Sequence, residues 1–308
     1  MCFSIPMSAT HPCTPLERGK DSMSKQYTIG IDIGGTKMAA VLFNGKRVVA
    51  DSYLATPKDS LNHFLVMLYA LIQPLEEKAK KDGVEITGVG LGVPAPLDLK
   101  REKILFAPNL PILNGVKLAK KLSEKIGKPV VMDNDASCFI RGEAIMGAGR
   151  KYKNVFGVTL GTGIGGAWWI DGNSYTTTHA GACEISESVV DYSNGSLLEE
   201  VYHRLTQNNP ANLAEDAYRG DVLAEKAFQE VGKYLGITLA NIVNLIAPEV
   251  IVVGGSVVNS GDLFWSSIYK SLTESIRSPE IRKNIRLEKS ALGKDAGAIG
   301  AALLTGQQ

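Results

Sequence analysis

Gly30-Ile31-Asp32-Ile33-Gly34-Gly35-Thr36-Lys37 lies near the start of this 308-residue sequence, between two short apolar runs. The runs, residues 27–33 and 38–43, are rich in β-branched and apolar side chains, so the pattern predicts a strand, a glycine turn and a second strand. The same design returns at residues 154–170, where Gly157-Val158-Thr159-Leu160-Gly161 precedes another glycine-rich turn and another apolar run. Repetition over so long a separation indicates two similar lobes.

The rest of the chain alternates further strands with helices, which predicts an α/β protein with two sheets. Ser60 is an expected N-cap, Gly83 an expected helix end, and Pro74 should kink or interrupt the helix between them. The expected elements are helix 60–81, strand 86–93, helix 115–126 starting after Asn114, strand 129–132, helix 136–146, helix 223–246, strand 249–253, helix 261–276, a short strand and a last helix from Ala296. We expect a disordered tail over 1–23, an N-terminal lobe over 24–135 with 295–308 packing back on it, and a C-terminal lobe over 136–294.

Composition narrows the classes of partner. Hydrophobic residues make up 44% of the chain and charged residues 21%, which is typical of a folded globular protein. The net charge is +1, from 33 basic and 32 acidic residues, so nucleic acid is not an expected partner. No apolar run reaches about 18 residues, so no membrane span is expected. Four cysteines without a Cys-x-x-Cys pair indicate no structural zinc and fit a reducing cytoplasm.

Three glycine-rich turns are candidate phosphate sites. Glycines at a strand end let backbone N–H groups approach an anion, although a single turn of this kind is also ordinary hairpin chemistry. Matching turns in two halves, with a third glycine pair later, favour nucleotide binding. Lys37 is a candidate phosphate contact, with a solvated lysine as the other interpretation. The candidates are Gly34, Gly35, Thr36, Lys37, Gly161, Thr162, Gly163, Gly254, Gly255 and Ser256.

Two better-known phosphate motifs do not fit these turns. Residues 30–37 end Gly-Thr-Lys where a P-loop needs Gly-Lys-Ser/Thr, and a strand follows them where a P-loop has a helix. Residues 161–166 have G-x-G-x-x-G spacing, yet they also continue as a strand, whereas a dinucleotide fingerprint opens a helix.

Five motifs in order resemble the ROK family of sugar kinases and repressors, within the actin-like ATPase superfamily, over residues 26–305. They are residues 32–37, Asn134-Asp135-Ala136, residues 161–166, Val253-Gly254-Gly255 and residues 295–301. The resemblance implies an α/β fold of two actin-like, ribonuclease H-like lobes with a cleft between them. It also implies ATP and Mg²⁺ as cofactors and a homodimer or homotetramer.

The resemblance assigns roles that the residues alone leave open. Asp135 would be the general base of phosphoryl transfer, although by itself it could be a helix N-cap. Asp32 would hold Mg²⁺, through water, although by itself it could be a turn former. The implied sugar contacts are Asn109, Asn134, Asp135, Glu184, Glu187 and Glu199.

The sequence departs from the family pattern where a zinc loop is usual. Glu187 stands where the family has a histidine that contacts sugar and zinc, and residues 190–196 contain none of the expected cysteines. The two losses agree, so no structural zinc is expected. An ionised glutamate accepts but does not donate hydrogen bonds, which leaves the identity of the sugar open.

The resulting hypothesis is an ATP-dependent, glucokinase-like hexose kinase that converts glucose to glucose 6-phosphate in the cytoplasm. Fructose, mannose or an N-acetylhexosamine remains open as substrate, and ADP or polyphosphate as donor. A protein of another class, a sugar sensor or a transcriptional regulator without turnover, is the alternative.

Overall fold

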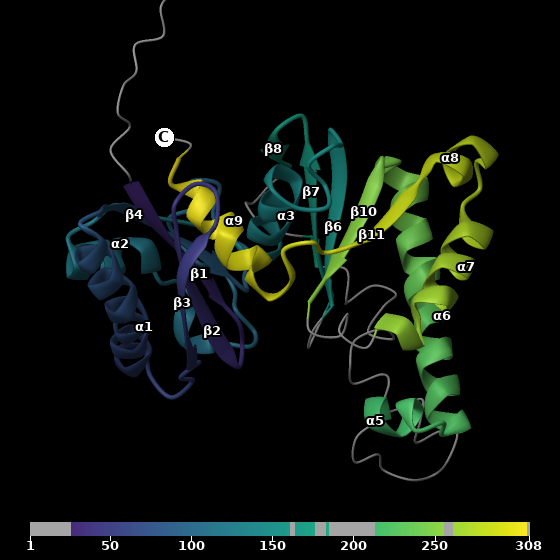
Figure 1. Cartoon of the computed structure of the whole chain (residues 1–308), viewed down its shortest axis with the longest axis horizontal. Helices are drawn as coiled ribbons and strands as arrows, with labels where there is room; N and C mark the ends of the chain where they lie inside the picture. The colour runs from purple at the N-terminus through teal and green to yellow at the C-terminus, as the bar shows by residue number, and fades with distance from the viewer. Residues whose placement is uncertain (1–25, 161–163, 176–182, 185–212, 256–260, 307–308) are drawn as a thin grey trace, which may run out of the picture.

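The computed structural model describes residues 26–160, 164–175, 183–184, 213–255 and 261–306, and it contains two sheets (Figure 1). In the first sheet the order is β3-β2-β1-β4-β5, with β1, β2 and β3 antiparallel and β1, β4 and β5 parallel. Its strands are β1 Gln26–Ile33, β2 Lys37–Phe43, β3 Val48–Ala55, β4 Glu85–Val93 and β5 Val130–Asn134.

The second sheet repeats this arrangement. Its order is β11-β10-β6-β7-β8, again with one antiparallel side and one parallel side, and β9 pairs with β7. Its strands are β6 Asn154–Leu160, β7 Ile164–Ile170, β8 Asn173–Ser174, β9 Cys183–Glu184, β10 Val250–Gly254 and β11 Arg286–Lys289. The expectation of an α/β protein with two similar lobes is confirmed.

Helices cover the sheets in layers (Figure 1). Helices α1 (Leu61–Asp82) and α2 (Leu118–Ile126) cover the outer face of the first sheet. On the second sheet the outer layer contains α5 (Leu213–Tyr218), α6 (Val222–Ile246) and α7 (Trp265–Ser275), followed by α8 (Pro279–Asn284). Helices α3 (Asp135–Ile145) and α9 (Ala296–Leu304) lie between the two sheets.

The alternation along β1 explains how α9 reaches the first sheet. Ile29, Ile31 and Ile33 point into the apolar core shared with α1. Gly30 faces the other way, where a Cβ would lie 1.9 Å from the carbonyl oxygen of Ala298 in α9. Successive side chains of a strand point to opposite faces of the sheet. Strand β1 therefore presents isoleucine side chains to α1 on one face and a glycine without a side chain to α9 on the other.

The two inner helices meet just as closely. A Cβ on Gly300 of α9 would lie 1.7 Å from the carbonyl oxygen of Cys138 in α3, and one on Gly90 of β4 would lie 1.8 Å from that of Ala301. Both approaches are far shorter than any contact a Cβ can make. Glycine at these positions is therefore required for the helices to sit between the sheets.

The structure corrects several local predictions. Helix α1 begins after its N-cap Ser60 and ends at Gly83 as expected, but it runs unbroken through Pro74. The helix expected from 115 starts only at Leu118, because Asn114 ends a 3-10 turn and its side chain accepts a hydrogen bond from the Ala107 N–H. Strand β3 and helices α5 and α8 were not predicted. Within the described ranges, no helix has the length and apolarity needed to cross a membrane.

We predict that Gly300→Ala destabilises the protein by about 3 kcal/mol, the upper end of the usual cost of overpacking, because the new methyl group collides with backbone that no rotamer change can move. Urea unfolding of the two proteins measures the difference. Gly261→Ala is the matched control, since among the described residues its Cβ would meet only the end of the flexible Lys289 side chain, 3.3 Å away. Equal stabilities for the Gly300 variant and the wild type would contradict the packing described for α3 and α9.

Candidate functional site

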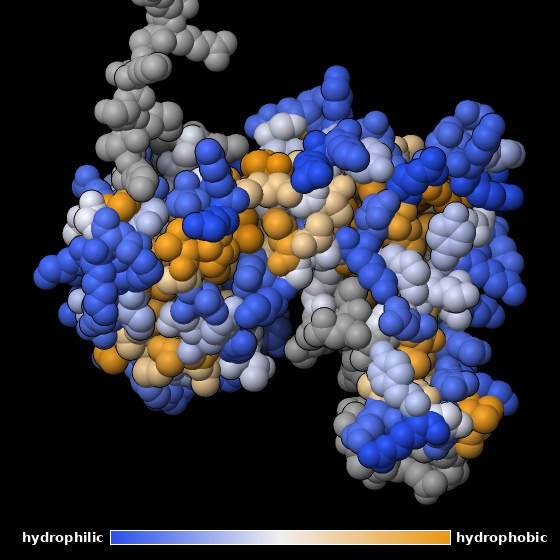
Figure 2. All heavy atoms as spheres, in the orientation of Figure 1, coloured by the Kyte–Doolittle hydropathy of each residue, from blue (hydrophilic) through white to orange (hydrophobic). Residues whose placement is uncertain are grey.

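A cavity of about 560 Å³ lies between the two lobes and receives residues from both. In the same orientation as Figure 1, the molecular surface is hollowed between the lobes (Figure 2). Strand ends, glycine turns and the segment before α9 form its walls. The residues that line it are Asp32, Gly34, Lys37, Ala39, Tyr53, Asp135, Phe139, Thr159, Gly254, Gly255, Lys289, Ser290, Gly293, Lys294 and Gly297.

Asp32 stands near the carboxyl end of β1 with its side chain in this cavity. Its carboxylate lies against Gly297 in the first turn of α9, where a Cβ would be 2.6 Å from Oδ2. Among the described residues, no side chain or N–H group forms a hydrogen bond or ion pair with this carboxylate. Burial alone raises the pKa of Asp32 to about 6. The carboxylate is thus poorly solvated and has room for a cation.

Asp135 is the first residue of α3, and the N-cap is its neighbour Asn134. The Asn134 Oδ1 accepts from the N–H groups of Ala136 (2.9 Å) and Ser137 (3.2 Å), while its Nδ2 donates to the carbonyls of Val93 (3.4 Å) and Ala95 (3.3 Å). These bonds use the full capacity of the amide. Asn134 therefore fixes the entry to α3 and relieves Asp135 of the capping role.

The Asp135 carboxylate has an unusual proton affinity. Burial, followed by the nearby charge of Asp32, raises its pKa to about 7, although the N–H of Ala136 donates to Oδ1 at 2.8 Å. Two carboxylates in one poorly solvated site disfavour double ionisation, so they titrate as a coupled pair. A carboxylate with a pKa near neutrality can both accept and release a proton at physiological pH.

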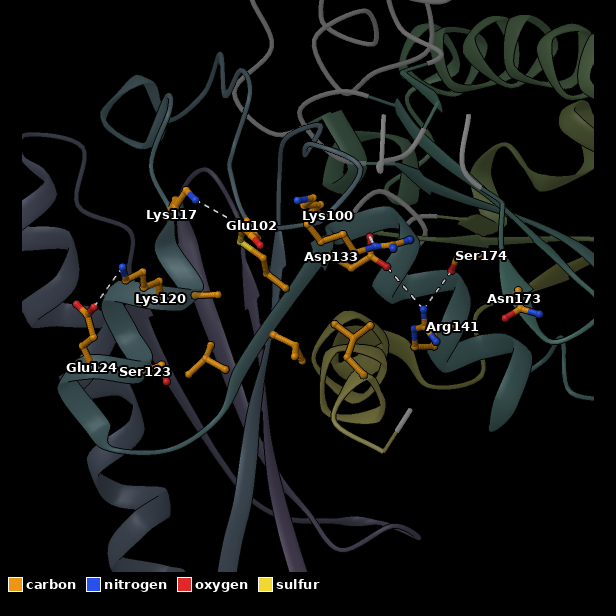
Figure 3. Close-up of a pocket in the computed structure, with 16 residues that line it drawn as sticks. Lys100, Glu102, Lys117, Lys120, Ser123, Glu124, Asp133, Arg141, Asn173 and Ser174 are labelled. Carbon is orange, nitrogen blue, oxygen red and sulfur yellow. Dashed lines mark hydrogen bonds and ion pairs between the residues drawn. The ribbon is translucent and has the colours of Figure 1, made fainter. Parts of the chain in front are cut away.

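Asp133, two residues earlier, has the opposite environment. It is fully buried, and its Oδ1 lies 3.2 Å from Arg101 Nε while its Oδ2 lies 3.6 Å from Arg141 Nη2. Figure 3 shows Asp133 and Arg141 pointing toward each other, with Ser174 also beside Arg141, in a second cavity of about 930 Å³. No sequence pattern indicated these ion pairs, which anchor the end of β5 just before Asn134 and Asp135.

The first glycine turn connects β1 to β2, as the sequence predicted, and the third turn is described as far as Gly255. Gly34 donates its N–H to the Lys37 carbonyl (3.0 Å), and the buried Thr56 braces the turn by donating from Oγ1 to the Gly34 carbonyl (2.7 Å). Gly255 has φ +96°, and a Cβ there would lie 2.2 Å from the carbonyl oxygen of Leu160. Gly255 of the third turn therefore lies against the end of β6. In sequence, the second glycine turn starts at the residue after Leu160.

A buried carboxylate connects α3 to the cavity wall. Glu143 accepts from Ser290 Oγ (2.6 Å) and from the N–H groups of Leu292 (2.9 Å), Ala291 (3.2 Å) and Ala148 (2.8 Å). These bonds hold the connector between β11 and α9, which carries Ser290, Gly293 and Lys294 to the cavity. Sequence reasoning missed Glu143, because its partners lie far away along the chain.

Some expected site residues line the cavity, others are described but are not among its lining residues, and the rest lie outside the described residues. Asp32, Asp135, Gly34, Lys37, Gly254 and Gly255 line the cavity. Asn109 is exposed and neighbours Gly35, whose Cβ would lie 3.4 Å from that of Asn109; Thr36 is exposed in the turn. Glu184 is described only as backbone in β9, paired with Gly165. Six expected site residues lie outside the described residues: Gly161, Thr162, Gly163, Glu187, Glu199 and Ser256. Residues 190–196, on which the expectation of no structural zinc rests, also lie outside them.

The residues present suit a magnesium nucleotide. Within the described part of the chain, no group of three or more His, Cys, Asp or Glu side chains gathers at one point. Mg²⁺ is typically held by one or two carboxylates together with substrate phosphates. Asp32 offers a carboxylate of this kind, without a hydrogen-bond or ion-pair partner among the residues that the structure describes. Lysines and bare glycine turns around it suit the phosphates.

Two repeated α/β lobes that share a cleft with a carboxylate pair and glycine turns define a protein of the actin-like ATPase fold. The chain belongs to the ROK family, whose model matches residues 28–308. It is similar to a glucokinase from Halalkalibacterium halodurans (28% identity over 93% of this chain and 97% of the relative) and to an N-acetyl-D-glucosamine kinase from Erwinia tasmaniensis (28%, 89% and 98%). The crystal structure of a ROK family glucokinase from Streptomyces griseus in complex with glucose and AMPPNP superposes with a TM-score of 0.81, at 29% identity, over 92% of this chain and 100% of that chain.

We predict that Asp135→Asn stabilises the ligand-free protein increasingly as the pH rises from 5 to 8. A carboxyl whose pKa is raised on folding contributes stability below its unfolded pKa, near 3.9, and that stability is lost as the pH rises through the folded value, here about 7. Asparagine has no charge to desolvate. Melting temperatures of both proteins across this pH range measure the effect.

Asp98→Asn is the control with the opposite sign. Backbone N–H groups of Lys103 and Glu102 bond to this carboxylate and lower its pKa, so its removal should destabilise the protein by an amount that stays constant from pH 5 to 8, because this carboxyl titrates below that range. A difference between Asp135→Asn and the wild type that does not change with pH would contradict the pKa assigned to Asp135.

Proposed function

We propose that this protein catalyses ATP-dependent phosphorylation of a hexose hydroxyl group, with Asp135 as the general base. The observation that carries the proposal is the environment of the Asp135 carboxylate. This carboxylate is not the N-cap of α3, and it lies poorly solvated near Asp32 in a cleft between the lobes. The kinases among its ROK relatives and the glucokinase with bound glucose and AMPPNP support the same class of reaction.

In the proposed mechanism, Asp135 accepts the proton of the sugar hydroxyl as that oxygen attacks the γ-phosphorus. The bond from the γ-phosphorus to the oxygen that bridges it to the β-phosphate breaks, and ADP leaves with that oxygen. The charge of Asp32 and the burial of the site raise the proton affinity of Asp135, which favours proton acceptance. Asn134 keeps the carboxylate in place by capping α3 and bonding to the loop after β4. The reaction therefore depends on orientation and on a tuned carboxylate, as expected of phosphoryl transfer.

We assign binding of the phosphate donor, ATP, to Asp32, Lys37 and the glycine turns. We place Mg²⁺ at Asp32, where the negative charges of the carboxylate and of the phosphates would together neutralise the charge of the metal. When bound, the metal would supply charge neutralisation of the donor phosphates. We assign the same phosphates to backbone N–H groups of the glycine turns and to the positive charge of Lys37. The turns assigned are 34–37 and 254–255, together with 161–163 and Ser256, which lie outside the described residues.

Glucose is the proposed substrate, with phosphorylation at its 6-hydroxyl. The proposed sugar contacts are Asn109, Asn134, Asp135, Glu184, Glu187 and Glu199. Relatives at the same 28% identity act on glucose in one case and on N-acetyl-D-glucosamine in another, so fructose, mannose and N-acetylhexosamines belong in the test. Glu187 in place of a histidine removes a hydrogen-bond donor at neutral pH and would alter which hydroxyl groups are matched.

We predict sugar-dependent release of ADP from MgATP by the purified protein, tested with glucose, fructose, mannose, N-acetylglucosamine and N-acetylmannosamine and with a control without sugar. Rapid turnover with one sugar would identify the substrate. Hydrolysis that ignores sugar, or sugar binding without turnover, would favour a switch or a sensor and would refute the kinase proposal.

We predict that Asp135→Asn lowers kcat by about 100-fold to 10,000-fold, the usual contribution of a general base, and leaves the dissociation constant for MgATP nearly unchanged. In the wild type, kcat/KM for the sugar should rise with pH through about 7, because the ionised carboxylate is the base. Steady-state kinetics between pH 5.5 and 8.5 measure both. A flat profile, or an active variant, would reassign the base.

A further inference from the structure

Tyr53 lies between two lysines that come from distant parts of the chain. The Nζ of Lys37 is 4.0 Å from the centroid of the Tyr53 ring, and the Nζ of Lys294 is 4.7 Å from it. The Tyr53 hydroxyl donates to Asp295 Oδ1 at 3.1 Å. An aromatic face attracts ammonium groups through its quadrupole, so the ring holds two cations close together.

Strand register places this group directly beside the proposed metal site. Asp32 on β1 pairs with Ala39 on β2, and Ala39 pairs with Tyr53 on β3. Residues directly opposite one another share a face of the sheet, so Tyr53 lies two strand spacings, about 10 Å, from Asp32. The small Ala39 between them leaves a trough that forms part of the cavity floor.

Lys294 reaches this trough from the connector between β11 and α9. It belongs to the 3-10 turn Gly293–Asp295, which leads directly into α9. Three residues later, Gly297 touches the Asp32 carboxylate, so the same short segment contributes to both ends of the trough. Glu143 fixes the start of this segment through its bonds to residues 290–292.

The lysines differ in how strongly they are already paired. Lys289 lines the same cavity, but its Nζ forms an ion pair with Asp262 at 3.1 Å. Lys37 and Lys294 are exposed at the cavity, and within the described residues neither has a carboxylate within ion-pair distance. Lys294 also interacts with the Tyr53 hydroxyl and, at longer range, with the charges of Asp295 and Asp51, which together raise its pKa. A polyanion can bind both ammonium groups without first breaking an ion pair of the described residues.

We infer that Lys294 is a second phosphate-binding residue, paired with Lys37, and that Tyr53 is the positioning residue that holds both lysines over the trough. The ligand is the polyphosphate chain of a nucleoside triphosphate whose metal-bearing end lies at Asp32. This inference rests on the proposed kinase function, and it adds Lys294 and Tyr53 to the donor site. Lysine suits the role because its ammonium is a compact charge that binds phosphate as a point cation.

The test is the affinity of Lys294→Gln for MgATP, MgADP and AMP, measured by titration calorimetry without sugar. A charge-assisted phosphate contact predicts a loss of about tenfold for MgATP, a smaller loss for MgADP and none for AMP. Lys294→Arg should restore affinity to within about threefold, because the charge is retained. The KM for the sugar should not change in either variant.

Two Tyr53 variants separate the ring from its hydroxyl. Tyr53→Phe keeps the platform for both ammonium groups, so its MgATP affinity should stay near that of the wild type. Tyr53→Leu removes the platform, so MgATP affinity should fall about threefold or more. In the double variant Tyr53→Leu, Lys294→Gln, the losses should be less than additive, because both changes act on one interaction.

Lys46→Gln is the matched control for charge. It removes the same charge from the turn of the β2–β3 hairpin, at the end away from Lys37, and should leave nucleotide binding unchanged. An equal loss in Lys46→Gln, or unchanged MgATP affinity in Lys294→Gln, would overturn the inference. If the wild type bound no MgATP or phosphorylated no sugar, the proposed function would fail instead, so the two failures can be told apart.

Discussion

The contact of α3 with α9 between the two sheets is the constraint on which the site depends. Gly300 brings the backbones of the two helices together, while Gly30 and Gly90 let α9 lie directly on the first sheet. Asp135 opens α3, and Gly297 in the first turn of α9 lies against Asp32. A wider separation of the helices would move Asp135 away from Asp32. The same bare surfaces that allow close packing therefore set the spacing of the two carboxylates.

That spacing has an electrostatic cost which the ligand-free protein carries. Burial raises the pKa of both carboxylates, and the charge of Asp32 raises that of Asp135 further. A cation at Asp32 would favour its ionised form and reduce its repulsion of Asp135. The ammonium groups of Lys37 and Lys294 contact the Tyr53 ring, at the end of the trough away from Asp32 and within the same cavity. The site thus carries negative charge where a metal is expected and positive charge where phosphates are expected, which is the arrangement that a magnesium nucleotide completes.

Local sequence patterns predicted the fold well because its repeating unit is local. A strand, a glycine turn and a strand can be read from residues 27–43, and the second copy can be read in the same way. Pro74 misled the prediction, since the 22-residue helix α1, with six buried side chains on the sheet, continues through it. Asn114 resembled an N-cap in sequence, but the structure uses its side chain to hold Ala107. In both cases tertiary contacts outweighed a local preference.

Contacts between distant segments could not be predicted in this way. Tyr53 and Asp295 lie 242 positions apart and Glu143 and Ser290 lie 147 apart, and no periodicity links them. Even for Asp135, the sequence alone could not separate a capping residue from a base. That choice depends on Asn134, whose side chain fills the capping position.

Three acidic residues in and just before α3 have different environments, and only one of these environments suits the proposed general base. Asp133 is buried between the guanidinium groups of Arg101 and Arg141, and Glu143 is buried with four donors on its two oxygens. Each of these carboxylates is compensated and faces away from the cavity between the lobes. Asp135 alone of the three lines that cavity, and it lies near a second negative charge, although the Ala136 N–H donates to it. Since a base must have a raised proton affinity and access to the substrate, Asp135 is the one carboxylate of this helix that meets both requirements.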